Sequence, residues 1–284
     1  MLIAGTTASG KTDLAIRIAE ETDAVIVSAD AMTVYRGLDV GTAKPSIKER
    51  AAILHYGIDI RNLGEAFDVS EFIALVEEVQ QRHPRVIVAG GTTFWMQALL
   101  NPLADLPPPN PSVRAELEKL EDPYQHLEDL DPTAAARLHP NDRVRIVRAL
   151  EVHRLTGKTQ TELHEAGPSR EPLNAHVIWL DRDHLRERIE ARLAGMWSAG
   201  YIEEAEWALS QDPKGLSKPL QSFAYRHLVE HLKGDLELDE AKWRTSRDTW
   251  HFARKQRTWA RGLGWAGTLE DLPIEQAKIW FERQ

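Results

Sequence analysis

Short apolar runs alternate with helix-forming segments through the first hundred residues of the chain. Residues 1–4, 25–28 and 85–89 are nearly uninterrupted apolar runs, whereas residues 13–19 and 70–82 have apolar side chains at helical spacing. The runs predict buried strands, and the spacing predicts amphipathic helices. Apolar strands that alternate with helices are typical of a parallel sheet covered on both faces. In such a sheet, ligands bind where the carboxyl ends of the strands meet.

The pattern changes after residue 100. A proline-rich connection, residues 101–111, leads into helical segments without an obvious strand, at residues 111–120, 132–138 and 142–155. An apolar run at residues 177–180 predicts a return to the sheet, and helical segments follow at residues 184–199, 201–210, 221–232 and 240–261. We therefore expect a core domain formed by residues 1–111 and 166–284, with a helical insertion at residues 112–165.

Composition narrows the class of protein. Hydrophobic residues make up 42% of the chain, as in ordinary globular proteins, and there are no cysteines, which excludes disulfides and thiolate chemistry. No run approaches the roughly 18 apolar residues of a membrane helix. The chain opens on a strand rather than on a signal peptide. We expect a cytoplasmic protein without a membrane partner.

The first strand is followed by a complete phosphate-loop motif, G-x-x-x-x-G-K-[ST]. Its eight residues are Gly5, Thr6, Thr7, Ala8, Ser9, Gly10, Lys11 and Thr12. Between a strand and a helix, such a loop binds phosphate through its backbone N–H groups and the helix N-terminus. Lys11 would reach the terminal phosphate, and the Thr12 hydroxyl would bind Mg²⁺. The fold class expected is therefore α/β, with a P-loop NTPase-like core. The motif does not say whether the polyphosphate is a nucleotide, such as ATP, or another compound.

Two polar residues follow the neighbouring strands. Asp30 comes after the strand at residues 25–28, and Thr92 follows Gly90 and Gly91 after the strand at residues 85–89. At the same edge of the sheet, Asp30 could act as a general base or support Mg²⁺, and Thr92 could bind a leaving group or cap a helix. The strand at residues 85–89 lacks the terminal Asp of a Walker-B element, which counts against an ordinary ATPase.

The chain is acidic overall but has one basic stretch. Its net charge is −9, yet residues 242–261 contain seven basic residues and only one acidic residue, Asp248. This stretch is either a solvated helix face or a surface for nucleic acid. Trp243 and Trp250 lie seven positions apart and are expected in the core, although some tryptophans of this region could stack on unpaired bases. The histidines form no ligand set for a transition metal.

Longer motifs carry a resemblance to a known family. The run from Ser28 to Pro45, S-A-D-A-M-T-V-Y-R-G-L-D-V-G-T-A-K-P, resembles the tRNA dimethylallyltransferases, also called tRNA isopentenyltransferases. So do Gly90-Gly91-Thr92, the segment from His139 to Glu151, and the segment from Ala253 to Arg261. These motifs occur in the family's order and span nearly the whole chain.

The resemblance implies prenyl transfer from dimethylallyl diphosphate to N6 of adenosine 37, beside the anticodon of a tRNA. The phosphate loop would hold the diphosphate leaving group, with Mg²⁺ on Thr12. Asp30 would accept the N6 proton, and Thr92 would orient the reacting groups. The resemblance assigns tRNA contacts to Asp30, Ala31, Met32, Thr33, Thr92, Arg114, Val144, Arg145, Ile146, Val147, Arg148, Lys255, Arg257 and Arg261. The helical insertion would embrace the anticodon stem-loop, and we expect a monomer.

This sequence departs from the family pattern at several positions. Ala31 and Thr33 replace a serine and a glutamine, and Gln221 replaces an arginine that helps to bind diphosphate. We expect Lys218 or Arg226 to supply the missing charge. Two alternatives stay open at this point: a P-loop kinase acting on a small molecule or nucleoside, and a tRNA-binding relative without catalytic activity.

Overall fold

The computed structural model describes residues 1–265 and 274–283. The chain divides into two compact units. We call Met1–Leu99 with Asn174–Gln284 the core unit, and Leu100–Leu173 the helical unit. Among the described residues, no helix combines the length and the apolar character needed to cross a membrane.

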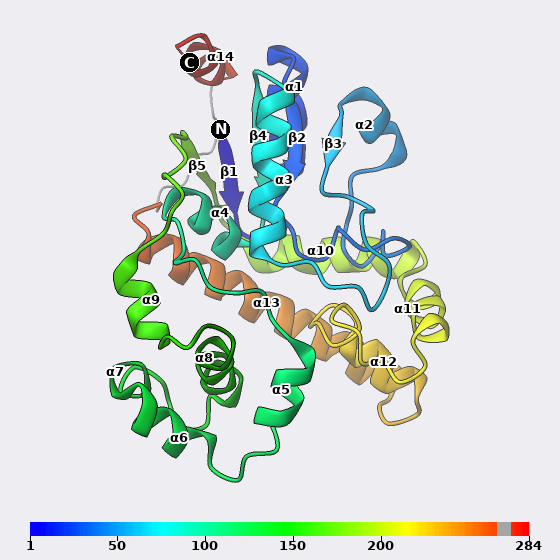
Figure 1. The fold of residues 1–284 in the computed structure, drawn as a ribbon. Helices are drawn as coiled ribbons and strands as arrows, with labels where there is room; N and C mark the ends of the chain where they lie inside the picture. Colours follow the sequence, from blue (N-terminus) through cyan, green and yellow to red (C-terminus); the bar gives the residue numbers. More distant parts are fainter. Residues whose placement is uncertain (266–273, 284) are drawn as a thin grey trace. The chain divides into compact units, whose positions relative to one another are not determined.

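A parallel sheet forms the centre of the core unit, as the apolar runs predict (Figure 1). Within the described residues its strand order is β3-β2-β4-β1-β5. The strands are β1 (Leu2–Gly5), β2 (Val25–Ser28), β3 (His55–Tyr56), β4 (Val86–Gly90) and β5 (Val177–Leu180). Strand β1 lies between β4 and β5, with Leu2 opposite Val88 and Val177. Strand β3 has only two residues, and no sequence pattern indicated it.

Helices cover both faces of this sheet. On one face, Ile3, Ile26 and Ile87 pack in one buried cluster with residues of α1 (Lys11–Thr22) and α14 (Ile274–Glu282). On the other face, α3 (Val69–Arg82) packs against β4. Helix α3 begins at a capping box, in which Asp68 and Glu71 each accept a hydrogen bond from the other's backbone N–H. The remaining helices of this unit are α2 (Ile47–Ala52), α4 (Thr93–Leu100), α10 (Leu185–Ser198), α11 (Tyr201–Gln211), α12 (Arg226–Leu232) and α13 (Leu238–Gly262).

Helices α10, α11 and α13 agree with the predicted segments, whereas α14 was not predicted and α12 differs at its start. Helix α12 begins at Arg226 rather than at residue 221, because residues 217–225 form turns. Helices α10 and α13 lie on the side of the sheet where the strands end (Figure 1). They therefore face the edge at which a ligand is expected.

The helical unit has its own small core. Its helices are α5 (Pro111–Leu117), α6 (Pro123–Leu130), α7 (Pro132–Ala135), α8 (Arg143–Thr156) and α9 (Gln160–Ala166). Leu127 of α6 and Ile146 and Leu150 of α8 are buried together. The sequence pattern did not predict helices α6 and α9. This unit contains the range 112–165 that the sequence suggested as an insertion.

Candidate functional site

The phosphate loop joins β1 to α1 as the motif requires. Gly10 precedes α1 with a φ of 91°, a left-handed conformation that costs glycine little. The Lys11 ammonium folds back over the loop and donates a hydrogen bond to the Thr6 carbonyl at 2.6 Å. Burial lowers the pKa of Lys11 to about 7, and the nearby Arg192 guanidinium adds to this shift, while Asp30 and Asp181 oppose it.

Side chains from distant segments fix this loop in place. Gln256 of α13 accepts a hydrogen bond from Thr7 N–H at 2.9 Å and donates one to the Gly91 carbonyl at 2.8 Å. It therefore ties the phosphate loop to the end of β4. Arg188 of α10 donates to the Ala8 carbonyl at 2.8 Å.

Asp181, which follows β5, anchors the other side of the loop. It accepts a hydrogen bond from the Thr6 hydroxyl at 3.1 Å and pairs with Arg257 through contacts of 2.7 and 3.0 Å. Arg257 was expected to contact tRNA. In the structure its guanidinium pairs with Asp181 beside the phosphate loop, and its contact with tRNA stays a prediction.

Asp30 and Thr92 lie together at the carboxyl ends of β2 and β4. The Thr92 hydroxyl accepts a hydrogen bond from Ala31 N–H at 3.1 Å, and Asp30 accepts one from Met32 N–H at 2.9 Å. Gly90 permits this proximity, because a Cβ there would collide with the backbone of Ala29. The two candidate catalytic residues are thus held by one hydrogen-bonded turn.

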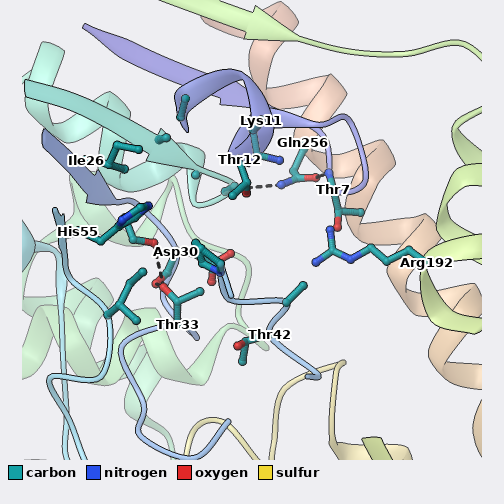
Figure 2. A pocket seen from close by; sticks show the side chains of 18 of the residues that line it. Thr7, Lys11, Thr12, Ile26, Asp30, Thr33, Thr42, His55, Arg192 and Gln256 are labelled. Carbon is teal, nitrogen blue, oxygen red and sulfur yellow. Dashed lines mark hydrogen bonds between the residues drawn. The ribbon is translucent and has the colours of Figure 1, made fainter. Parts of the chain in front are cut away.

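Two cavities meet at these residues. An inner cavity of about 100 Å³ is lined by Lys11, Thr12, Asp30, Thr33 and Arg192, among others (Figure 2). A larger cavity of about 460 Å³ shares Asp30 and Arg192 with it and also contains Thr92, Ala31 and Met32. The wall of the larger cavity is mostly apolar and includes Ile189, Leu193, Met196, Phe223 and Phe252. A polar phosphate site therefore opens directly onto an apolar chamber.

Thr33 lies on the polar side of this arrangement. It is buried, and its hydroxyl lies 2.9 Å from that of Ser28 and donates to the Asp30 carbonyl at 3.1 Å. Its side chain supports the turn that carries Asp30, whereas Ala31 and Met32 face the larger cavity.

Arg192 is a site residue that the sequence reasoning missed. It lies on α10 and its side chain reaches the inner cavity (Figure 2). Burial lowers its pKa, and Asp30 opposes the shift. A signal was available, because Arg192 interrupts the apolar stripe formed by Ile189, Leu193 and Met196. Gln256 likewise interrupts the buried stripe of α13.

Lys218 and Arg226 were expected to replace the diphosphate-binding arginine of the family. Both lie outside the inner cavity. Arg226 pairs with Asp248 of α13 and donates to His227. Lys218 donates to the Phe67 carbonyl at 3.4 Å. Neither residue lines the inner cavity, where Arg192 is found. The structure therefore does not bring Arg226 or Lys218 to the phosphate loop.

In the helical unit, a buried carboxylate binds two of the expected tRNA contacts. Glu151 is fully buried and pairs with Arg114 at 3.0 Å and with Arg148 at 2.5 Å. These arginines and a backbone N–H of Asn110 hold the pKa of Glu151 below its usual value, against the effect of burial. Both guanidinium groups thus stabilise the unit itself.

The neighbours of Arg148 on α8 divide into two groups. Ile146 and Val147 are buried, and their assignment as RNA contacts stays a prediction. Val144 and Arg145 are exposed, with 80% of Val144 and 73% of the Arg145 side chain accessible. The exposed pair can meet a partner without rearrangement.

The basic stretch of α13 is also divided. Arg244 pairs with Glu240, and Arg247 pairs with Asp248, whereas Lys255 and Arg261 are exposed. Trp243 was expected in the core, but it is 55% exposed and lies against Arg247. The exposed cations at the end of α13 remain available to a polyanion.

Two side chains at the inner cavity carry oxygen atoms that could act as metal ligands. The exposed Thr12 side chain and the carboxylate of Asp30 line the same cavity. Throughout the described ranges, no group of three or more His, Cys, Asp or Glu side chains could hold a metal by itself. An ion here would take the rest of its ligands from a substrate or from water, which is the usual arrangement for Mg²⁺.

Comparison with known proteins decides the family. The model of the IPP transferase family matches residues 33–263. A tRNA dimethylallyltransferase of Geotalea uraniireducens is 40% identical over 272 residues, covering 91% of this chain and 88% of that protein. One from Heliobacterium modesticaldum is 38% identical over 280 residues, covering 92% and 86%. This chain belongs to the IPP transferase family.

Solved structures agree with this assignment. The tRNA isopentenylpyrophosphate transferase of Bacillus halodurans is 28% identical, has a TM-score of 0.66, and is matched over 99% of this chain and 94% of its own. A eukaryotic dimethylallyltransferase acting on tRNA gives a TM-score of 0.79 at 25% identity, over 91% of this chain and 69% of its own. The resemblance that the sequence motifs indicate, the fold class and the prenyltransferase class are confirmed. A kinase is not favoured.

Proposed function

We propose that this IPP transferase moves a dimethylallyl group from dimethylallyl diphosphate to N6 of adenosine 37 in tRNA. The observation that carries the proposal is the pair of joined cavities, because a phosphate loop with Asp30 and Thr92 beside it opens into an apolar chamber. A diphosphate ester of a branched hydrocarbon has the same two parts, and a kinase would not need the second.

The donor would bind with its diphosphate on the loop between Gly5 and Thr12. Backbone N–H groups, Lys11 and Arg192 would stabilise the negative charge that grows on the leaving diphosphate. The position of Arg192 supports this role, because its side chain lines the same cavity as Lys11. It would supply the charge that the family arginine, here Gln221, does not. The apolar wall around Leu193 and Phe252 would enclose the dimethylallyl group and exclude water from C1.

The acceptor adenine would have to leave the stacked anticodon loop to reach the cavity. As the C1–O bond to diphosphate breaks, the N6 lone pair forms the new N–C1 bond. Asp30 would then accept the N6 proton, as a general base within the turn that Thr92 holds. Ala31 and Met32 would contact the inserted base.

Mg²⁺ fits the site because it prefers oxygen ligands, which the side chains of the site provide. The Thr12 hydroxyl would hold it together with substrate oxygens and water, which leaves the Asp30 carboxylate free to accept the N6 proton. When bound, the ion neutralises charge on the diphosphate. We further propose that the tRNA backbone meets Arg145 of the helical unit and Lys255 and Arg261 of α13. Because one chain lines both cavities, the enzyme would act as a monomer, in the cytoplasm where tRNA is modified.

Mass spectrometry tests this proposal. The protein is incubated with Mg²⁺, dimethylallyl diphosphate and an anticodon stem-loop that carries consecutive adenosines. We expect a mass increase of one dimethylallyl group on the stem-loop, and none when guanosine replaces the target adenosine. In a parallel incubation with ATP, phosphate transfer would favour a kinase. Stem-loop binding without product would favour a non-catalytic relative. Either result contradicts the proposal.

Asp30→Asn tests the assigned base separately. Asparagine keeps an oxygen that can accept from Met32 N–H, so the turn should survive. Loss of the general base should lower the transfer rate by about 100-fold or more. Binding of the stem-loop should not change. A variant that loses binding together with activity would contradict the role of Asp30 as a base.

A further inference from the structure

Two aromatic side chains lie at the edge of the larger cavity and remain accessible. Phe94 belongs to the first turn of α4, and Trp259 belongs to α13. Their ring centroids lie 6.2 Å apart with an interplanar angle of 80°. Each residue is 41% exposed, and both line the cavity of about 460 Å³ that contains Asp30 and Thr92.

Packing of the core unit does not account for this exposure. Trp95, the next residue of α4, is 4% exposed and stacks on Phe72 at a centroid distance of 4.8 Å. Helix α4 therefore buries one aromatic ring and presents the adjacent one at a cavity opening. Large aromatic surfaces that stay accessible next to a cavity are characteristic of binding sites.

The charge around the pair is positive. Lys255 lies one helical turn before Trp259 and lines the same cavity. Arg254 and Arg261 are also exposed, and residues 249–265 include no acidic residue. Aromatic rings placed among cations are the combination with which proteins bind unpaired nucleotides, since the rings stack on bases and the cations contact the backbone.

We propose that Phe94 and Trp259 form a stacking platform for the nucleotide next to the target adenosine. The inference rests on the proposed function. To reach Asp30 and Thr92, the target adenine must enter the cavity, and its neighbour in the strand is held close to the opening by the backbone. The indole of Trp259 would stack on that neighbouring base, and the Phe94 ring would fix the indole from the side. Because every base has an aromatic face, the platform would accept any base.

The first test measures binding of the anticodon stem-loop without the prenyl donor. Trp259→Leu and Phe94→Leu remove the rings but keep apolar side chains. Trp243→Leu is the matched control, because it removes another exposed tryptophan of α13 that lies outside both cavities. We expect binding roughly ten-fold weaker for Trp259→Leu. Phe94→Leu should show a smaller loss, and the control none. Unchanged binding in Trp259→Leu would overturn the inference.

The second test identifies the nucleotide. Each neighbour of the target adenosine is replaced in turn by an abasic residue. For one of them, the loss of the base should weaken binding to the wild-type protein about as much as Trp259→Leu does, and should have no further effect in that variant. Equal effects of the abasic residue in both proteins would contradict stacking on Trp259. Trp259→Phe should recover part of the affinity, because a phenyl ring can also stack.

These outcomes are separable from the proposed function. Prenyl transfer by the wild-type protein is followed in the mass experiment, and inorganic diphosphate binding is compared between the wild-type protein and Trp259→Leu. If the wild-type protein transfers the prenyl group but the tryptophan variant binds RNA normally, only the platform is wrong. If RNA binding depends on Trp259 but no product forms, only the proposed reaction is wrong.

Discussion

Lys11 and Arg192 are two cations in one partly buried site. Each loses solvent, and the resulting desolvation lowers the pKa of both side chains. Asp30 and Asp181 only partly offset this effect for Lys11. A bound diphosphate would supply the missing negative charge and would raise the pKa of Lys11 again. Binding of the donor should therefore be coupled to uptake of a proton.

This coupling predicts a pH dependence. In the protein without bound substrate, the pKa of Lys11 is about 7. The charged form is therefore present below that pH and is lost as the pH rises through it. We expect kcat/KM for the prenyl donor to fall above pH 7, because kcat/KM reports the free enzyme. Rates measured between about pH 6 and pH 9 check this expectation. Lys11→Arg, which stays charged, should be less active but should lack the decline. A flat wild-type profile would show that the lowered pKa does not affect donor binding.

Arg192 gives a second prediction at this scale. Arg192→Ala removes a cation from the inner cavity, so the KM for dimethylallyl diphosphate should rise by about ten-fold or more. Arg226→Ala is the control, since Arg226 pairs with Asp248 rather than lining that cavity. Inorganic diphosphate binding, followed by calorimetry, separates an effect on the donor from one on tRNA. If the Arg226 variant lost affinity and the Arg192 variant did not, the original expectation for Arg226 would be right.

At the scale of elements, the sequence predicts what depends on local pattern. Strands β1, β2 and β4 are recognisable because each is a short apolar run. Helix α3 is recognisable because its apolar spacing and its capping residue Asp68 are close together in the sequence. Strand β3 is not, because its two residues, His55 and Tyr56, pair with β2 only after the chain has folded. The same limit applies to side chains. The spacing of Arg114 and Arg148 does not reveal that buried Glu151 binds both, since that requires α5 to pack on α8.

One half-buried carboxylate connects helix α11 to the segment that follows Leu38. Glu204 accepts hydrogen bonds from three consecutive backbone N–H groups, those of Asp39, Val40 and Gly41. It also accepts one from the Tyr225 hydroxyl at 2.7 Å. A charged acceptor with several donors contributes more to stability than a neutral one.

Glu204→Ala should therefore lower the free energy of unfolding by about 2–3 kcal/mol. Glu203→Ala is a matched control, because Glu203 lies in the same first turn of α11 but is exposed. Urea denaturation of both variants makes the comparison. Since Gly41 and Thr42 line the larger cavity, the Glu204 variant should also bind the donor more weakly. Equal stability of the two variants would show that this carboxylate does not hold the segment.

At the scale of the molecule, the net charge of −9 hides two separate basic surfaces. One is at the end of α13, at Lys255 and Arg261, and the other is Arg145 in the helical unit, whose exposed side chain also pairs with Asp142 at 3.4 Å. Some of their basic neighbours are paired within each unit, such as Arg148 with Glu151 and Arg257 with Asp181. The sequence alone predicted one basic stretch, residues 242–261, but not which cations stay accessible, because pairing depends on the fold. The accessible ones should carry the salt-dependent part of tRNA binding.

Arg145→Glu tests whether the helical unit contributes to that binding. We expect weaker binding of whole tRNA and a slope of log affinity against log salt that is smaller by about one. Binding of inorganic diphosphate should not change, because the phosphate loop belongs to the core unit. Arg186→Glu is the matched control. Its side chain is 72% exposed, against 73% for Arg145, but it lies on α10 of the core unit. If both reversals reduced tRNA binding equally, the effect would come from net charge alone, and the helical unit would not be a specific tRNA surface.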